Sequence, residues 1–155
     1  MTNTNKTWVS DEEYKRINEV IPIVSINLLV NFENKVLLVY RNNEPAKGEW
    51  WIPGGRIIKN ETFQETISRL TTNFGIEQES IIEIKQLHAH EFIRTEKNEN
   101  ENENYHHVSI VFLLKVNEKP NLPNNIKQKW TNEIDSNLDP YVQGILKENF
   151  SIILK

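Results

Sequence analysis

Cysteine is absent from the 155 residues, which excludes disulfides, thiolate chemistry and cysteine-ligated zinc. The sequence also lacks any apolar run of about 18 residues, the length that a membrane-spanning helix needs. Its N-terminus has no basic segment followed by an apolar one, so we predict no secretory signal. These absences favour a cytoplasmic protein that does not enter a membrane.

An excess of basic charge is lacking as well: 18 basic residues face 22 acidic ones, a formal net charge of −4. General nucleic-acid binding needs a basic surface that neutralises phosphates, so we expect no nucleic-acid partner. A small phosphorylated ligand stays open, because a few local arginines can hold it. The 4 Trp, 4 Tyr and 6 Phe are core-building residues and predict a folded domain.

The length fits a single domain, which we expect over residues 1–155. Residues 1–9 are expected to form a disordered tail. Residues 96–104 alternate almost perfectly between Glu and Asn, and this low-complexity segment predicts a mobile hairpin tip.

Capping residues and apolar periodicity predict three helices around a mixed sheet. Ser10 and Glu13 have the spacing of a capping box, so a short helix should follow and stop before Pro22. Its apolar face is expected to carry Tyr14, Ile17 and Val20. The other helices are expected over residues 61–73 and, after Asp139 as N-cap, 140–150. Strands are predicted over residues 23–30, 36–40, 81–93, 108–116 and 130–134, with a turn at 31–35 and a loop at 41–51.

A glycine pair after a proline marks the most informative segment. Pro53-Gly54-Gly55 indicates special backbone angles or the close approach of another group. Five residues then separate Gly55 from Glu61, and seven separate Glu61 from Arg69. This spacing resembles the first half of the Nudix box. Residues 40–51 and the run Arg69-Leu70-Thr71 further resemble the GDP-mannose mannosyl hydrolase branch of that superfamily.

The resemblance covers roughly residues 10–150 and implies an α+β Nudix fold, an α/β/α sandwich around a mixed β-sheet. It implies hydrolysis of a nucleoside diphosphate sugar such as GDP-mannose, with water attacking the anomeric carbon of the sugar and GDP leaving. Most Nudix enzymes instead direct water at phosphorus. The family implies Mg²⁺ or Mn²⁺ as cofactor, a base that activates water, and a homodimer.

Arg41 and Arg56 match the two phosphate-contacting arginines of the family and are candidates for both catalysis and substrate binding. A guanidinium group can hold phosphate oxygens bidentately; the alternative is that both are ordinary surface arginines. Gly54 matches the residue whose carbonyl oxygen binds the metal. Trp50 and Trp51 either stack on a base or belong to the core and its rim.

Glu61, Glu65 and Arg69 fall on one stripe of the predicted helix and can form an ion-pair ladder. The resemblance implies that Glu61 and Arg69 brace the loop against the helix. A metal-binding role for Glu61 is the alternative. Glu65 is a candidate catalytic carboxylate.

Three departures from the family pattern fall on its reaction centre. The metal-binding glutamate of the helix falls on Asn73 or Thr72, which bring no negative charge for Mg²⁺. The loop at residues 122–130 has no histidine, where the family has a glutamine ligand and a histidine base. Asn27 stands where the family has aspartate. The sequence therefore predicts a hydrolytic centre that is degraded or rebuilt from other residues.

The four histidines are the material for such rebuilding. His88 and His90 share one face of a predicted strand, and His106 or His107 must share it if the next strand pairs in register. The family places a histidine near His90 and a substrate-contacting polar residue near His107, so both are candidate substrate-binding residues. Half-exposed strand histidines and a transition-metal site are the alternatives. The nearest carboxylates are expected to be Glu65 and Glu91.

Two other functions stay open. One is a protein that binds a nucleotide sugar through Arg41 and Arg56 without turning it over, as a sensor or regulatory module. The other is a Nudix pyrophosphatase that attacks phosphorus, which is disfavoured because its helix glutamates are absent. Those positions carry Leu70, Asn73 and Phe74.

Overall fold

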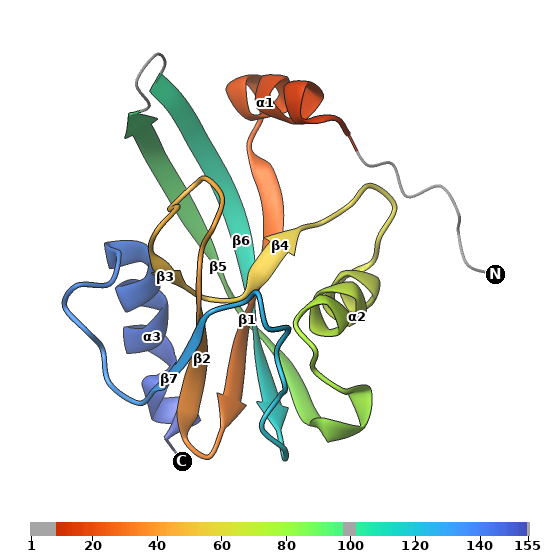
Figure 1. Cartoon of the computed structure of the whole chain (residues 1–155), viewed down its shortest axis with the longest axis vertical. Helices are drawn as coiled ribbons and strands as arrows, with labels where there is room; N and C mark the ends of the chain where they lie inside the picture. Colours follow the sequence, from red (N-terminus) through yellow and green to blue (C-terminus); the bar gives the residue numbers. More distant parts are fainter. Residues whose placement is uncertain (1–8, 98–101, 155) are drawn as a thin grey trace.

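The computed structural model describes residues 9–97 and 102–154. Within them, one mixed seven-stranded sheet follows the order β3-β2-β1-β6-β5, with β4 paired to β1 and β7 paired to β2. Helices α2 and α3 lie on opposite faces of this sheet (Figure 1). The α/β/α arrangement confirms the α+β fold expected from the sequence. None of the described helices is long and apolar enough to cross a membrane.

The helices are α1 (Asp11–Val20), α2 (Phe63–Asn73) and α3 (Pro140–Ile153), with a short 3₁₀ helix at Gln78–Ser80. The strands are β1 (Ile23–Phe32), β2 (Lys35–Tyr40), β3 (Trp50–Trp51), β4 (Gly54–Arg56), β5 (Ile81–Lys97), β6 (Asn102–Val116) and β7 (Gln128–Thr131).

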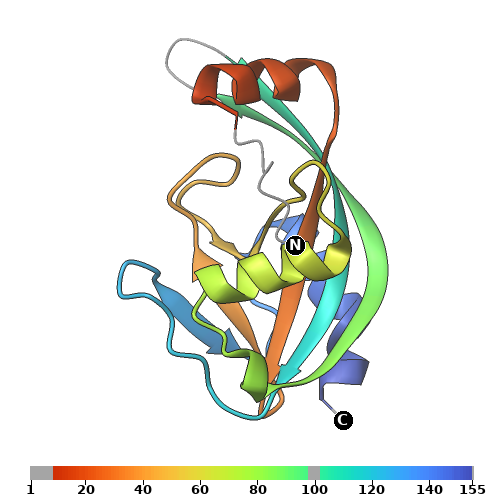
Figure 2. The ribbon, with the colours of Figure 1, turned by 90° about the vertical axis from the view of Figure 1, so that its right-hand side faces the viewer.

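The first helix begins at the capping box that the sequence predicts. Ser10 Oγ accepts a hydrogen bond from the backbone N–H of Glu13, whose carboxylate accepts one from the N–H of Ser10. Helix α1 lies over the far end of the β5–β6 hairpin (Figure 2). Its predicted apolar face is only partly correct: Tyr14 and Ile17 are half-buried, but Val20 is 71% exposed.

The strands of both hairpins are longer than predicted. Glu33 and Asn34 both adopt positive φ angles, which lets β1 run to Phe32 and β2 start at Lys35. Likewise β5 reaches Lys97 and β6 starts at Asn102, so the predicted tip at residues 96–104 was drawn too long. Residues 98–101 of that tip and residues 1–8 of the predicted tail lie outside the described residues.

The boundaries of four other elements, α2, β3, β7 and α3, also differ from the prediction. Helix α2 begins at Phe63 rather than at residue 61, because Thr62 caps it and Glu65 completes a second capping box. The predicted loop at 41–51 ends in a short strand, β3, which pairs with the end of β2. Strand β7 starts two residues earlier than expected, and α3 ends at Ile153 instead of residue 150.

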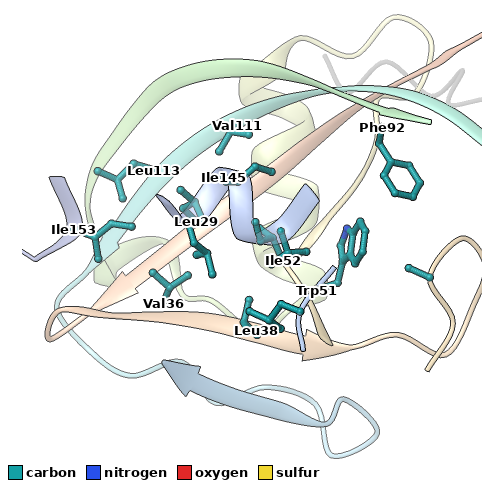
Figure 3. Close-up of a cluster of buried hydrophobic side chains, with 14 of the residues drawn as sticks. Leu29, Val36, Leu38, Trp51, Ile52, Phe92, Val111, Leu113, Ile145 and Ile153 are labelled. Carbon is teal, nitrogen blue, oxygen red and sulfur yellow. The ribbon is translucent and has the colours of Figure 1, made fainter. Parts of the chain in front are cut away.

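Alternating residues of the sheet build two apolar layers. One face packs Leu29, Leu38 and Leu113 against Ile145 and other residues of α3 (Figure 3). The other face packs the neighbouring positions, Leu28 and Leu114 among them, against Ile67 and Leu70 of α2. Because β1 is buried on both faces, its polar residues stand out from an otherwise apolar strand.

Candidate functional site

A cavity of about 570 Å³ opens where β1, β4 and β6 meet α1, α2 and α3. Of the residues predicted to take part in catalysis, substrate binding or metal binding, it brings together Gly54, Arg41, Arg56 and His107. His90 and Glu65 are not among its lining residues. Glu65 lines a different hollow, with Phe63 and Ile67.

The glycine pair is explained by how closely β4 lies against β1. Gly54 pairs with Asn27, and a methyl group there would overlap Asn27 Oδ1 and the carbonyl oxygen of Ile26. At Gly55, a Cβ would lie 2.7 Å from Cδ2 of Leu70. The close approach of backbone therefore requires glycine at Gly54, as the sequence indicated, whereas at Gly55 the neighbouring atom is the end of the flexible Leu70 side chain.

Arg41 follows β2 and reaches the cavity partly buried. Its Nε donates to the carbonyl oxygen of Pro45 at 2.6 Å, which fixes the direction of the guanidinium. Burial lowers the pKa of Arg41 from its ordinary value of 12.5. A desolvated cation of this kind is stabilised by an anionic ligand.

Arg56 ends β4 and lies under α1. Its guanidinium carbon lies 5.0 Å from the centre of the Tyr14 ring, a cation–π arrangement. Both Arg56 and Arg41 line the same cavity, so the sequence-predicted pair of arginines does converge.

Glu61 and Arg69 form the brace that the resemblance implies. Arg69 donates to Glu61 Oε1 at 2.8 Å, to Oε2 at 2.9 Å and to the carbonyl oxygen of Arg56 at 2.8 Å. Glu61 Oε2 also accepts from the N–H of Ile58 and from Thr66 Oγ1. The Arg69 hydrogen bonds, with the Ile58 N–H, hold the pKa of Glu61 near 2 although burial opposes this. Glu61 lies just before α2, so the predicted single stripe on the helix is wrong.

His107 is on β6, opposite Phe92 of β5. Its Nε2 is buried and has no hydrogen-bond partner. Burial, with the nearby charge of Arg41, lowers the pKa of His107 to about 4. The imidazole is therefore neutral at pH 7.

Sequence reasoning singled out Asn27 as the position of the family's aspartate, but it missed Ser25, Ser109 and Tyr141, which join Asn27 in a chain of hydroxyl and amide groups that lines the cavity. Asn27 Nδ2 donates to the Tyr141 hydroxyl at 2.8 Å, Ser109 also hydrogen-bonds that hydroxyl, and Ser25 Oγ lies 2.7 Å from Ser109 Oγ. Burial raises the pKa of Tyr141 to about 12, so its hydroxyl stays protonated. Ser25, Asn27 and Ser109 are buried polar residues on apolar strands, and that pattern is a signal that could have located them.

The two tryptophans divide between core and rim, one of the alternatives given above. Trp51 is buried and stacks on Tyr141 with ring centres 5.4 Å apart. Trp50 is half-buried, with Lys127 and Lys129 over its ring.

The histidines take up different environments. His88, His90 and His107 share one face of the β5–β6 pair, as expected, while His106 is on the other face and contacts Glu91 at 3.1 Å. His90 Nε2 lies 3.2 Å from a carboxylate oxygen of Glu148, outside hydrogen-bond geometry. That partner was missed because it comes from α3.

The transition-metal alternative for the histidines is wrong for the described part of the chain. There, no three His, Asp or Glu side chains converge in a way that could hold a metal ion. Of the two carboxylates expected near the histidines, Glu91 does contact one, His106, whereas Glu65 lies in the cap of α2.

The structure is an α/β/α domain with a cavity, lined by Arg41 and Arg56, at the junction of its central strands. Residues 21–139 match the NUDIX domain, and the chain belongs to this family. The family match confirms the recognition that rested on Gly55, Glu61 and Arg69. The family and its hydrolase neighbours support the expected class, a Nudix hydrolase.

Two curated relatives share parts of the sequence. The low-salt glycan biosynthesis protein Agl8 of Haloferax volcanii is 44% identical over 64 residues, 41% of this chain. An ADP-ribose pyrophosphatase of Methanocaldococcus jannaschii is 31% identical over 97 residues, 61% of this chain. The matched segments span only 41% and 52% of those relatives' own lengths.

Solved structures support the fold. A MutT protein from Methanosarcina mazei superposes with a TM-score of 0.61 and 21% identity, over 86% of this chain and 96% of that one. A bifunctional NMN adenylyltransferase/ADP-ribose pyrophosphatase from Francisella tularensis, complexed with AMP and a Mn ion, gives 0.53 and 23%, over 90% and 46% of the two chains.

Nudix hydrolases generally use a divalent metal, and the residues of this chain do not fit that requirement. Hard cations need several carboxylate or carbonyl oxygens. Glu61 Oε2 already accepts three hydrogen bonds and Oε1 a fourth, and Asn73 is the cavity residue where the helix glutamate would be. Gly54, whose carbonyl is the other expected ligand, lines this cavity, and no group of three His, Asp or Glu side chains that could hold a metal ion is present among the described residues.

Proposed function

We propose that this chain hydrolyses a nucleoside diphosphate sugar, GDP-mannose being the nearest model, with the diphosphate bound between Arg41 and Arg56. The observation that carries the proposal is the convergence of these two guanidinium groups on one cavity. Arginine forks match phosphate oxygens in geometry as well as charge. The cavity volume of about 570 Å³ suits a small-molecule ligand.

The arginines support attack at the sugar rather than at phosphorus. When the anomeric carbon–oxygen bond breaks, negative charge develops on the departing diphosphate, and preorganised cations stabilise it. Attack at phosphorus relies more heavily on metal ions that polarise the phosphoryl group. Glu61, Asn73 and Gly54, described above, do not provide the ligands that would hold such ions.

The names of the two relatives support a sugar-containing substrate. One is a glycan biosynthesis protein, and the other is a pyrophosphatase for ADP-ribose, itself a nucleoside diphosphate joined to a sugar.

A second candidate is a protein that binds the nucleotide sugar without hydrolysing it. The observation that favours it is the misfit between the cavity and the family's metal. Binding needs only Arg41, Arg56 and a cavity, whereas hydrolysis also needs an activated water.

Hydrolysis in ¹⁸O-labelled water, followed by proton and phosphorus NMR of GDP-mannose, tests the proposal. We expect GDP and mannose, with the label in mannose, because water joins the anomeric carbon. GMP and mannose 1-phosphate with the label on phosphorus would contradict the proposal in favour of the pyrophosphatase. Unchanged substrate with ligand resonances shifted by the protein would establish the binding module instead.

A further inference from the structure

We infer that His107 is the base that activates the attacking water, and that the reaction needs no metal ion held by the Nudix box. This inference rests on the proposed function, because it names the water-activating group of that same site. The base that activates water, for which the sequence offered no residue, would then lie on β6. The family's own base would lie in residues 122–130, which contain no histidine.

The carboxylates of the Nudix box and its helix, Glu61 and Glu65, are both engaged in structural hydrogen bonds. Glu61 is buried, with its side chain 2% exposed, and both oxygens are occupied by Arg69 and by groups of the adjacent loop and helix. Glu65 accepts hydrogen bonds from the backbone and hydroxyl of Thr62 at the start of α2. Neither can act as base without dismantling the element that it caps or braces.

His107 lies in the cavity where a base that activates water is needed. It is the only histidine among the described residues that line the cavity with Arg41 and Arg56. Its Nε2 is buried and has no hydrogen-bond partner, so this nitrogen gives up no contact when it accepts a proton. Burial and Arg41 keep the ring in the neutral form that can accept a proton at pH 7.

The surroundings of His107 agree with this role. Phe92 and Tyr105 contact its ring edge-on from β5 and β6, at 6.2 Å between ring centres. The charged groups that act on its titration are Arg41, from the loop after β2, and the neighbouring His106. Asp11 and Glu44 are the acidic residues that line the cavity, and Glu44 acts on Arg41; neither is among the groups that shift the pKa of His107. Burial and the positive charge of Arg41 keep the imidazole unprotonated before it takes a proton from water.

The reaction balances without a metal. The water oxygen bonds to the anomeric carbon and gives one proton to His107. The bond between that carbon and the β-phosphate oxygen breaks, and its electron pair leaves with GDP, which Arg41 and Arg56 neutralise. His107 then returns the proton to solvent. The sum is GDP-mannose plus water giving mannose, GDP and a proton.

The test compares His107→Asn with His106→Asn in protein freed of metal by EDTA. The two histidines are adjacent on β6 but face opposite sides of the sheet, which makes His106→Asn a matched control. We expect wild type and His106→Asn to keep hydrolysing GDP-mannose in EDTA. His107→Asn should lose about 100-fold or more in kcat with little change in KM.

Two further readouts separate a base from a structural residue. Calorimetric binding of GDP-mannose by His107→Asn shows that the variant is folded and its cavity intact. The kcat/KM of the wild type should rise with pH through an apparent pKa of about 4 and stay level above it.

Three outcomes would overturn the inference. Turnover that EDTA stops and Mg²⁺ restores would show a metal-dependent reaction, while the proposed function would stand. Equal kcat in His107→Asn and wild type would show that another group activates water. Binding of GDP-mannose with no turnover under any condition would overturn the proposed hydrolysis itself, and this inference with it.

Discussion

Glu61 shows how a carboxylate of the Nudix box can serve the fold. Its two oxygens accept from Arg69, from the N–H of Ile58 and from Thr66 Oγ1. Arg69 in turn holds the carbonyl oxygen of Arg56, so the pair fixes the strand that carries a phosphate-binding candidate. The chemistry of the cavity thus depends on this buried pair indirectly, through position.

Removing Arg69 should be strongly destabilising. Arg69→Ala would leave Glu61 buried without its counter-ion, and breaking a buried pair in this way costs about 3–5 kcal/mol. Urea unfolding of the variant at pH 7 measures this loss. Arg16→Ala, which removes an exposed arginine on α1, should change stability by no more than about 0.5 kcal/mol. Similar effects of the two substitutions would contradict the brace.

The same pair makes stability depend on acid. The folded-state pKa of Glu61 is about 2, below its ordinary value of 4.5, so its contribution is complete above pH 4.5 and is lost as pH falls toward 2. We expect the free energy of unfolding to decrease over that window. In Glu61→Gln the decrease should be smaller, and identical pH profiles of the two proteins would contradict the assignment.

At this scale, the sequence located part of the site. Arg41, Arg56 and Gly54 were named because the residues around them resemble the family. Strand alternation left His106 and His107 as alternatives, and the resemblance favoured His107. Tyr141 was missed because it reaches the cavity from α3, and nothing near it in sequence refers to β1. The contact between His90 and Glu148 was missed for the same reason.

Strand β4 and helix α3 show that the demands on glycine differ between elements. A side chain at Gly54 would collide with the backbone and side chain of β1, whereas one at Gly144 in α3 would meet nothing within 4 Å. The first glycine is required by the approach of two strands. The second glycine, Gly144, is not required by any contact and only lowers the helix propensity of α3.

Alanine at these two glycines should therefore have opposite effects. Gly54→Ala is expected to destabilise by about 1–3 kcal/mol or more, because the overlap is partly with backbone that cannot turn aside. Gly144→Ala should stabilise by about 0.5–1 kcal/mol, since alanine is the better helix former. Thermal unfolding compares both with wild type. Destabilisation of similar size at both positions would contradict the described strand contact.

Elements were predictable where the signal is local. The capping box at Ser10 and the Asp139-Pro140 pair gave the starts of α1 and α3 correctly. The start of α2 was misplaced because Glu61 was taken for the first turn, although Thr62 and Glu65 form the box. Strand β3 depends on pairing with β2, which no local pattern reveals.

The cavity belongs to the whole molecule rather than to any one motif. Its walls come from α1, from the loop after β2, from β1, β4 and β6, and from the ends of α2 and α3. Arg94 ties several of these parts together: it contacts Glu49 of the loop at 2.5 Å and Asp139 at the start of α3 at 3.3 Å. The binding groups are therefore held in place by segments far apart in the sequence.

The central claim is that this cavity binds a nucleoside diphosphate through its two arginines, and calorimetry with GDP in EDTA tests it most directly. Arg56→Ala removes a charge-assisted contact to phosphate, so binding should weaken by about 1.5–3 kcal/mol relative to wild type. Arg16→Ala, the exposed arginine, should leave the affinity unchanged. Equal affinity for GDP in the Arg56→Ala variant and the wild type would contradict the account.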